Sequence, residues 1–308
     1  MESQSGCSLP IIYKPFDGTE KSHWVDRGHL YDFLYSTKGM RKKLLDFGPG
    51  DGWPSLIIAP FAQEIVGLDS SNSRVQICTE NARRLGINNA EFKYYSAGEN
   101  IPFDNNTFDG IMAASSIEQT PNPKQTLHEL FRVLKPGGQL RIKYESLHRY
   151  KDGKEKDFWI TELKNKQSRI ILFNRNIEEE YVIQYGITLS MSRQELRDVI
   201  SKIIKDISYA NIAELLDIIK NHIIHVNKLR TTHPSGKTYA EWLKEIGFKK
   251  VIPSHDGGMA AANLYDYYKD IKTVREVESV DKLIKPTAKV VCYLDAPIKT
   301  DPPITAIK

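Results

Sequence analysis

The heptapeptide DFGPGDG, residues 46–52, decides the fold of this chain. It follows an apolar run at 42–47 that is typical of a buried strand, so its closely spaced glycines come directly after a strand. Glycine lets the backbone turn sharply and approach a ligand because it has no Cβ atom. In an open parallel α/β sheet, such a turn at the carboxyl end of a strand is a place where ligands bind.

The spacing of the glycines separates two classes of ligand. Dinucleotide enzymes use G-x-G-x-x-G, which aims a helix N-terminus at a pyrophosphate. Here the third glycine, Gly52, comes one residue early, and Trp53 stands where that pattern has its third glycine. Asp46 also precedes Gly48, where a carboxylate can meet an ammonium group. This arrangement favours a zwitterionic amino-acid moiety over a diphosphate, and it argues against a dehydrogenase.

A second acidic residue follows at the end of the next predicted strand. Asp69 ends the run QEIVGLD, residues 63–69. An acid at this position can accept hydrogen bonds from both hydroxyls of a ribose. A glycine turn alone is compatible with a plain tight connection between a strand and a helix. Together with Asp69 it predicts a nucleotide-like cofactor at the carboxyl edge of the sheet.

Short apolar runs alternate with helical patterns between residues 42 and 145, which is typical of βαβ units and a parallel sheet. The predicted helices begin at Ser71 as an N-cap, with Gly86 just past the end, and at Pro123, where the turn KPGG stops the helix. The predicted strands of this part are 42–47, 63–69, 90–95, 108–115 and 139–145.

The pattern changes after Glu145. The following segment mixes strand-like runs with helical patterns, including a predicted helix through 212–229, and a helix, a glycine and a strand return at 239–253. The apolar run 288–294 suits a buried strand. We expect a Rossmann-like, seven-stranded, mostly parallel sheet with helices on both faces and an α+β insertion after strand five. The expected parts are a helical lead-in (1–40), a Rossmann-like domain (41–149 and 230–298), an inserted substrate cap (150–229) and a C-terminal tail (299–308).

Three segments carry a resemblance to a known family. DFGPGDG (46–52) resembles the first motif of class I S-adenosylmethionine-dependent methyltransferases, in the methyltransferase type 11 group that includes ubiquinone and menaquinone biosynthesis enzymes. SAGENIPFDNNTFDGIMAASSIEQTPNP (96–123) resembles their segment from the third strand through the fourth. ELFRVLKPGG (129–138) resembles the helix and turn before their fifth strand. The resemblance implies an enzyme that uses S-adenosyl-L-methionine, and it does not identify the acceptor.

The same resemblance implies cofactor contacts for residues near the carboxyl ends of the first four strands. In order from the methionyl part through ribose and adenine to the sulfonium, they are Asp46, Gly48, Gly50, Asp69, Ser70, Ala97, Gly98, Glu99 and Ser115. One position departs from the family pattern. Many relatives carry an aspartate at the place of Ala97, and its carboxylate accepts from the adenine amino group. Here that contact would rest on backbone groups or on Glu99.

No catalytic triad is needed for this reaction. Methyl transfer to a good nucleophile requires an in-line approach and exclusion of water, and a base only when the acceptor must lose a proton. A solvated loop position is the simpler interpretation of the histidines, although a histidine can act as a base near neutral pH. The candidates for a base or an acceptor contact lie at the ends of predicted strands four to six or directly after them: Glu118, Gln119, Tyr144, Glu145, His148 and His255.

Three other features have simpler explanations. His222 and His225 lie three residues apart on a predicted helix, but no third ligand follows at useful spacing, so we expect a helix-surface pair and no metal site. Trp24 is expected in the core rather than over the cofactor. Asp301-Pro302-Pro303-Ile304 is similar to the D-P-P-Y motif of amino-group DNA and RNA methyltransferases. That motif belongs after the fourth strand, so we expect an extended tail here.

Composition limits the classes of function. A formal net charge of +4 without a long Lys/Arg run does not indicate nucleic acid as a partner. The 3 cysteines lie far apart and show no metal or disulfide spacing. No apolar stretch is long enough for a membrane span, and the first residues lack the pattern of a signal peptide, so we expect a cytoplasmic protein.

Three functions remain open from the sequence. The first is transfer of a methyl group to a small-molecule acceptor, with the insertion as a lid. The second is a protein or RNA methyltransferase, which predicts an open groove with a basic rim. The third is a non-catalytic S-adenosylmethionine-binding module. The acceptor atom and the oligomeric state are not indicated, because fold alone does not determine either.

Overall fold

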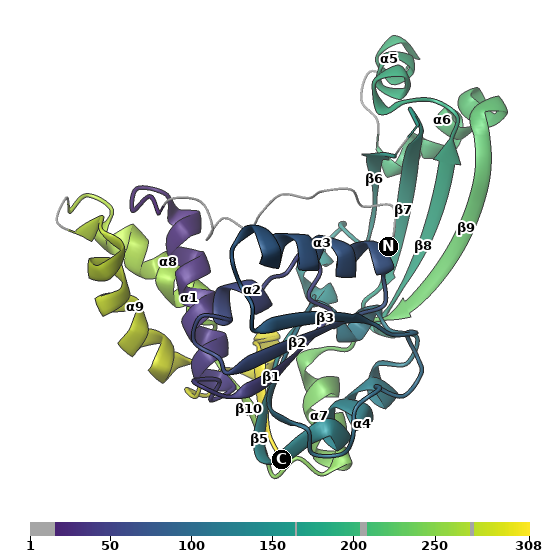
Figure 1. Ribbon diagram of the computed structural model, residues 1–308. Helices are drawn as coiled ribbons and strands as arrows, with labels where there is room; N and C mark the ends of the chain where they lie inside the picture. The colour runs from purple at the N-terminus through teal and green to yellow at the C-terminus, as the bar shows by residue number, and fades with distance from the viewer. Residues whose placement is uncertain (1–15, 164, 204–207, 272–273) are drawn as a thin grey trace. The chain divides into compact units, whose positions relative to one another are not determined.

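The computed structural model describes residues 16–163, 165–203, 208–271 and 274–308. Its described residues fall into two compact units (Figure 1). One unit is Ser146–Pro234, which we call the inserted unit. The other, which we call the sheet unit, combines the described residues up to Glu145 with Ser235–Lys308.

The sheet unit is built on a seven-stranded sheet in the order β10-β11-β5-β4-β1-β2-β3. Five neighbouring strands of this order, β5, β4, β1, β2 and β3, are parallel to one another. Strand β11 runs antiparallel to both β5 and β10. This confirms the Rossmann-like, mostly parallel sheet. The strands are β1 (Lys43–Phe47), β2 (Glu64–Asp69), β3 (Ala90–Tyr94), β4 (Phe108–Ala114), β5 (Leu134–Lys143), β10 (Lys250–Pro253) and β11 (Ile304–Ile307).

Helices cover both faces of this sheet (Figure 1). α4 (Pro123–Val133) and α7 (Gly236–Ile246) bury Leu127, Leu130 and Leu243 in one core. On the other face, α1 (Lys21–Ser36), α2 (Ser55–Ile58), α8 (Gly257–Tyr268) and α9 (Val277–Val291) share a second core. Trp24 is 0% exposed within it, as expected for a core residue.

The local signals for both ends of α3 (Asn72–Arg84) are confirmed, whereas the predicted turn KPGG is wrong, because these residues lie in β5, directly after α4 ends at Val133. Ser71 accepts a hydrogen bond from the Arg74 backbone N–H at the start of α3, and Gly86 follows this helix in the left-handed region. An N-cap oxygen of this kind satisfies one of the backbone N–H groups that has no partner within the helix. No helix in the described ranges has the length and apolarity to cross a membrane.

Two predictions near the C-terminus are wrong. Residues 288–294, predicted as a strand, form the end of α9 and the turn after it. The segment predicted as a tail contains β11, which lies inside the sheet between β5 and β10. The segment is helical because Val280, Ile284 and Ala288 are spaced four residues apart and are all buried, which matches one face of a helix.

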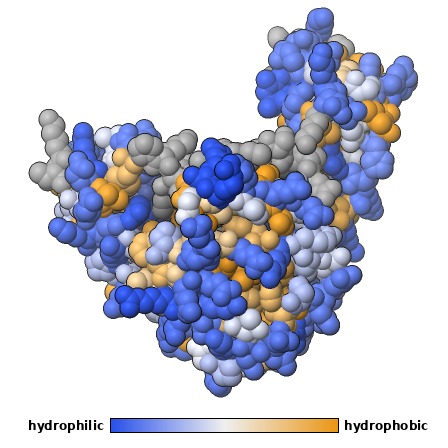
Figure 2. Space-filling model, viewed as in Figure 1, coloured by the Kyte–Doolittle hydropathy of each residue, from blue (hydrophilic) through white to orange (hydrophobic). Residues whose placement is uncertain are grey.

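The inserted unit is a four-stranded antiparallel sheet in the order β6-β7-β8-β9 with helices α5 and α6. α5 covers Arg193–Ile203 and α6 covers Ile212–Ile219, and their apolar residues share a core with the sheet. Hydrophobic colour appears along the edge of this unit where β9 runs (Figures 1 and 2). The strands are β6 (Lys156–Glu162), β7 (Ser168–Asn176), β8 (Tyr181–Leu189) and β9 (Ile223–Thr232).

The predicted helix through 212–229 is therefore wrong after Ile219. Residues from Ile223 onward pair with β8 as a strand. His222 ends a short 3-10 helix and His225 lies on β9, so the two histidines do not share a helix face. Within the described residues, no group of three or more His, Cys, Asp or Glu side chains is placed to hold a metal ion.

Candidate functional site

The glycine turn after β1 has the backbone that the sequence predicts. Gly48, Gly50 and Gly52 have φ angles of 75°, 60° and 110°, in the left-handed region that favours glycine. A Cβ atom on Gly48 would lie 2.4 Å from the Cβ of Ser116, whereas one on Gly50 would meet no atom of the described residues within 4 Å. Gly48 thus allows close packing against the end of β4, and the described part of the chain leaves space beside Gly50.

Asp46 lies at the base of this turn with a carboxylate that is only half satisfied. Its Oδ2 accepts from the Ser55 backbone N–H at 3.0 Å and from the Ser55 hydroxyl at 2.6 Å. Its Oδ1 is buried without a partner among the described residues. Burial raises the pKa of Asp46 to about 7. A buried acceptor without a donor costs free energy, so this oxygen fits a ligand that brings an N–H group.

Asp69 connects the end of β2 to the same turn. Its two carboxylate oxygens accept from the Ser71 backbone N–H at 2.9 Å and from the Gly50 backbone N–H at 3.3 Å. Burial raises the pKa of this carboxyl as well. The structure therefore brings Asp46, Gly48, Gly50 and Asp69 together as expected, and these residues fit a zwitterionic nucleoside cofactor.

The predicted adenine contacts follow β3. Gly98 and Glu99 line a small pocket together with Tyr95 and with residues of α4 such as Thr126. Gly98 has a φ of 95°. Ala97 and Glu99 are exposed, and Ser70 is half-buried at the end of β2. The contacts of these residues with an adenine stay predictions.

Ser115 follows β4 in an unusual backbone conformation. Its φ is 50°, and its backbone N–H donates to the Lys143 carbonyl at 2.7 Å. The hydroxyl of its neighbour Ser116 is buried without a partner in the described part of the chain. Sparsely populated backbone conformations cluster at functional sites. The predicted place of Ser115 beside the reacting sulfur stays a prediction.

Two of the catalytic candidates are held inside the core of the sheet unit. Glu118 is 1% exposed, and its carboxylate accepts from the Glu145 backbone N–H at 2.9 Å and from the Tyr239 hydroxyl at 3.5 Å. Burial raises the pKa of Glu118 to about 7. The Tyr144 hydroxyl donates to the Pro302 carbonyl at 3.0 Å. These contacts give both residues a structural task, and a catalytic role for them stays a prediction.

The two histidine candidates are both exposed. His148 is exposed in the inserted unit, in a 3-10 helix at Leu147–Tyr150. His255 is exposed after β10, and its backbone carbonyl accepts from Arg141. Gln119 and Glu145 are half-buried. A role as a base remains a prediction for each histidine.

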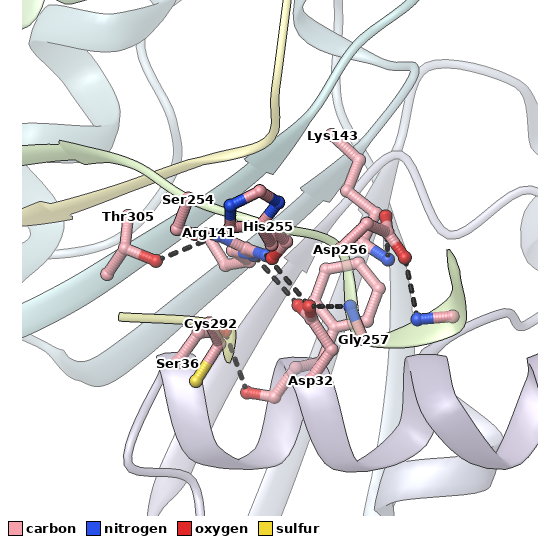
Figure 3. A network of polar contacts seen from close by, with 12 residues as sticks. Asp32, Ser36, Arg141, Lys143, Ser254, His255, Asp256, Gly257, Cys292 and Thr305 are labelled. Atoms are coloured by element: carbon pink, nitrogen blue, oxygen red, sulfur yellow. Dashed lines mark hydrogen bonds and ion pairs between the residues drawn. The ribbon is translucent and has the colours of Figure 1, made fainter. Parts of the chain in front are cut away.

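Sequence reasoning missed a buried ion pair on β5 (Figure 3). Arg141 is 0% exposed and donates two hydrogen bonds to the Asp32 carboxylate, each at 2.8 Å. It also donates to the hydroxyls of Ser254 and Thr305. This network joins α1, β5, β11 and the loop before α8. It holds α1 against the sheet near the carboxyl end of β5.

A second group of charged residues lies two positions further along β5. The Lys143 ammonium is 2.9 Å from Oδ2 of Asp256, the N-cap residue of α8 (Figure 3). It is also 2.5 Å from Nδ1 of His29 on α1. The signal for both groups was present in the sequence. Two basic residues at positions i and i+2 of a central strand point to one face, and that face must supply partners for them once helices cover it.

The fold and this site define a class of protein. A parallel sheet with this strand order, an acid–glycine turn after β1 and an acid at the end of β2 is the architecture of class I methyltransferases. The CcbJ methyltransferase from Streptomyces caelestis has this fold, with a TM-score of 0.53 over 92% of this chain and 94% of that chain at 10% identity.

Relatives in sequence support the same class. A family model described as a methyltransferase domain matches residues 38–184. The uncharacterized methyltransferase YcgJ of Bacillus subtilis (strain 168) is 30% identical over 100 residues, which cover 32% of this chain and 39% of YcgJ. The demethylmenaquinone methyltransferase of Clavibacter sepedonicus is 32% identical over 102 residues, which cover 33% of this chain and 40% of that protein.

Residues 38–184 of this chain thus match the model of a methyltransferase domain, and the sheet has the Rossmann-like fold of S-adenosylmethionine-dependent methyltransferases. The alignments with YcgJ and with the Clavibacter protein span 39% and 40% of the length of these two curated relatives.

Proposed function

We propose that the chain transfers a methyl group from S-adenosylmethionine to a small-molecule acceptor. The observation that carries this proposal is the half-satisfied Asp46 carboxylate beside the open space at Gly50. A ligand without a hydrogen-bond donor at this place would leave the buried oxygen unsatisfied. An amino-acid moiety brings an ammonium group, and Asp69 stands next to it for a ribose.

The chain's own residues bind and orient in this proposal. Asp46 accepts from the ammonium of the methionyl part, and Asp69 accepts from the ribose hydroxyls. Gly98 and Glu99 form one wall of the adenine pocket. The bound cofactor supplies an electrophilic methyl group on a sulfonium. What remains for the protein is to hold the acceptor in line and to exclude water.

The choice of a small molecule rests on two supports. The Clavibacter relative is named for a quinone precursor, demethylmenaquinone. The net charge of the whole chain is only +4, which gives no reason to favour a nucleic acid as the acceptor. We further propose that the inserted unit acts as the lid, because the chain enters it directly after Glu145, at the carboxyl end of β5.

Isothermal titration calorimetry on the full chain tests the cofactor. We expect saturable binding of S-adenosylmethionine and of its demethylated product, S-adenosylhomocysteine, and no comparable binding of NAD. A preference for NAD would contradict the proposal. Turnover on protein or RNA acceptors, or tight binding with no turnover on any acceptor, would favour one of the two alternative functions instead.

A further inference from the structure

His29, Lys143 and Asp256 form a cluster of titratable side chains at the carboxyl edge of the sheet. Their side chains are 20%, 12% and 16% exposed, so the cluster lies at the rim of the core rather than deep inside it. The helices α1 and α8 contribute His29 and Asp256, and the last residue of β5 contributes Lys143.

Two contacts link this cluster to the cofactor site. The Lys143 carbonyl accepts from the backbone N–H of Ser115, which follows β4. The imidazole of His29 lies edge-on to the ring of Trp53, with ring centroids 5.4 Å apart, and Trp53 directly follows the glycine turn. The cluster therefore contacts Trp53, the residue after the glycine turn, and Ser115, the residue after β4.

The contact between Lys143 and His29 determines which imidazole nitrogen carries the proton. An ammonium group has only donors, so Nδ1 of His29 must accept, at 2.5 Å. Burial and the positive charge of Lys143 lower the pKa of His29 to about 4, and the ring is neutral at pH 7. A neutral imidazole that accepts at Nδ1 carries its proton on Nε2.

The remaining charges around the ring maintain this state. Asp256 holds the Lys143 ammonium at 2.9 Å, and its other oxygen accepts from the Gly258 and Met259 backbone N–H groups. That same oxygen is 3.4 Å from Nδ1 of His29. Arg141 and Asp32 neutralise each other in the layer below. Lys143 is thus fixed as a donor, and the contacts of His29 with charged groups among the described residues are made by Nδ1 and leave Nε2 for a ligand.

We propose that His29 donates a hydrogen bond from Nε2 to an oxygen of the methyl acceptor, and that Lys143 is the positioning residue that fixes this tautomer. This inference rests on the proposed methyltransferase function. It restricts the acceptor to molecules that present an anionic or carbonyl oxygen near the methylated atom, such as a carboxylate, an enolate or a quinone-like carbonyl. In this proposal His29 does not act as a base, because Nε2, which would meet the acceptor, already carries a proton.

Long-range proton–nitrogen NMR on the full chain tests the tautomer. We expect the His29 signals, assigned by their loss in His29→Gln, to show a neutral ring protonated at Nε2 at pH 7. Lys143→Met should remove this preference and raise the pKa of His29 from about 4 toward 6.5. Lys143→Arg keeps a donor and should keep the tautomer. Lys135→Met is the matched control, because Lys135 is another ion-paired lysine on β5, with Asp109 at 2.9 Å.

Acetate, the simplest carboxylate, then serves as the probe in protein saturated with S-adenosylhomocysteine. We expect acetate to shift the His29 Nε2 resonance saturably, and sodium chloride at equal ionic strength to leave it unchanged. A proton on Nδ1, a charged ring at pH 7, or no response to acetate would overturn the inference. Failure of S-adenosylhomocysteine to bind in calorimetry would instead overturn the proposed function, so the two failures are distinguishable.

Discussion

Asp46 and Asp69 end neighbouring strands, but their carboxylates have different environments. Asp69 has a backbone N–H donor for each oxygen, from Ser71 and Gly50. Asp46 has both of its donors, from Ser55, on a single oxygen. Asp69 is therefore already held in place to receive a ribose. Asp46 keeps one buried oxygen for a donor that arrives with the ligand.

We predict that Asp69→Ala weakens binding of S-adenosylhomocysteine by about 1.5–3 kcal/mol, the range of hydrogen bonds to a charged group. Calorimetry measures the loss, and circular dichroism checks the fold. Ser71→Ala is the control, because it removes the N-cap of α3 and leaves the carboxylate of Asp69 in place. A change of less than about twofold in a folded Asp69→Ala protein would show that Asp69 is not the ribose ligand.

We also predict that cofactor affinity depends on pH through Asp46. Its pKa is about 7 without ligand, and only the ionised carboxylate pairs with an ammonium group. Affinity should fall by up to about tenfold per pH unit below 7, because binding must then release a proton. Calorimetry in buffers of different ionisation enthalpy detects that proton. Asp46→Asn should bind more weakly at pH 8 and show no such slope.

The same shift affects folding in the opposite direction. The pKa of Asp46 is raised above its ordinary value of 3.8, so between about pH 4 and pH 7 the folded chain binds a proton that the unfolded chain has lost. The contribution of Asp46 to the free energy of unfolding therefore decreases as the pH rises through this window. Cofactor binding and apo stability thus change in opposite directions with pH.

At the scale of elements, the sequence predicts the first five strands well and the last part poorly. The spacing of apolar residues and the turn residues both indicate the elements between residues 42 and 145. The predicted ends of strands and helices there therefore lie within about five residues of the observed ends. The run 288–294 is short and apolar, which fits a strand or a buried helix equally. The helical spacing of Val280 and Ile284 before it would have resolved the ambiguity. β11 is only four residues long, and Pro302 and Pro303 directly before it favoured an extended tail in the sequence analysis.

Paired substitutions test this correction. Ile304→Ala should lower the free energy of unfolding by about 2–5 kcal/mol, because Ile304 is 0% exposed in β11 and the cavity adds to the lost burial. Leu294→Ala should change it by less than about 0.5 kcal/mol, because Leu294 is 51% exposed. Urea unfolding measures both. The reverse order of effects would restore 288–294 as the sheet strand.

The candidate site shows a similar limit. Asp46, Gly50 and Asp69 follow from motif spacing along the chain, and the structure brings them together. His29, Lys143 and Asp256 come from three distant elements, and only tertiary packing brings them into contact. A single sequence marks such a cluster only indirectly, through charges placed on the covered face of a strand.

At the scale of the molecule, the two units have separate cores, and this makes the role of the insertion testable. We predict that replacing residues 152–228 with a short flexible linker leaves the sheet unit folded. Cofactor affinity should change by less than about tenfold (1.4 kcal/mol), because all proposed cofactor contacts lie outside the replaced segment. Turnover on the native acceptor should disappear. Calorimetry and an activity assay on one protein measure both effects.

A different outcome would assign another role to the insertion. Ile224, Val226 and Leu229 are about half exposed, at 53%, 54% and 48%, and lie on β9, the edge strand of the inserted unit. If this edge serves assembly, the shortened chain should change its size in light scattering while it keeps its activity. Retained turnover would end the lid hypothesis.

The interrupted sheet also has a consequence for synthesis on the ribosome. β5 pairs with β11, so Leu140 and Ile142 can form their strand pairing only once Ala306 and Ile304 have been made. Those residues are translated only after the whole insertion. At about 5–20 residues per second, this delay lasts on the order of 8–30 s. The inserted unit is contiguous and can fold within it, while the nascent sheet keeps an open edge. Arg141 lies in the middle of that edge, and its charge discourages pairing with a strand from another nascent chain.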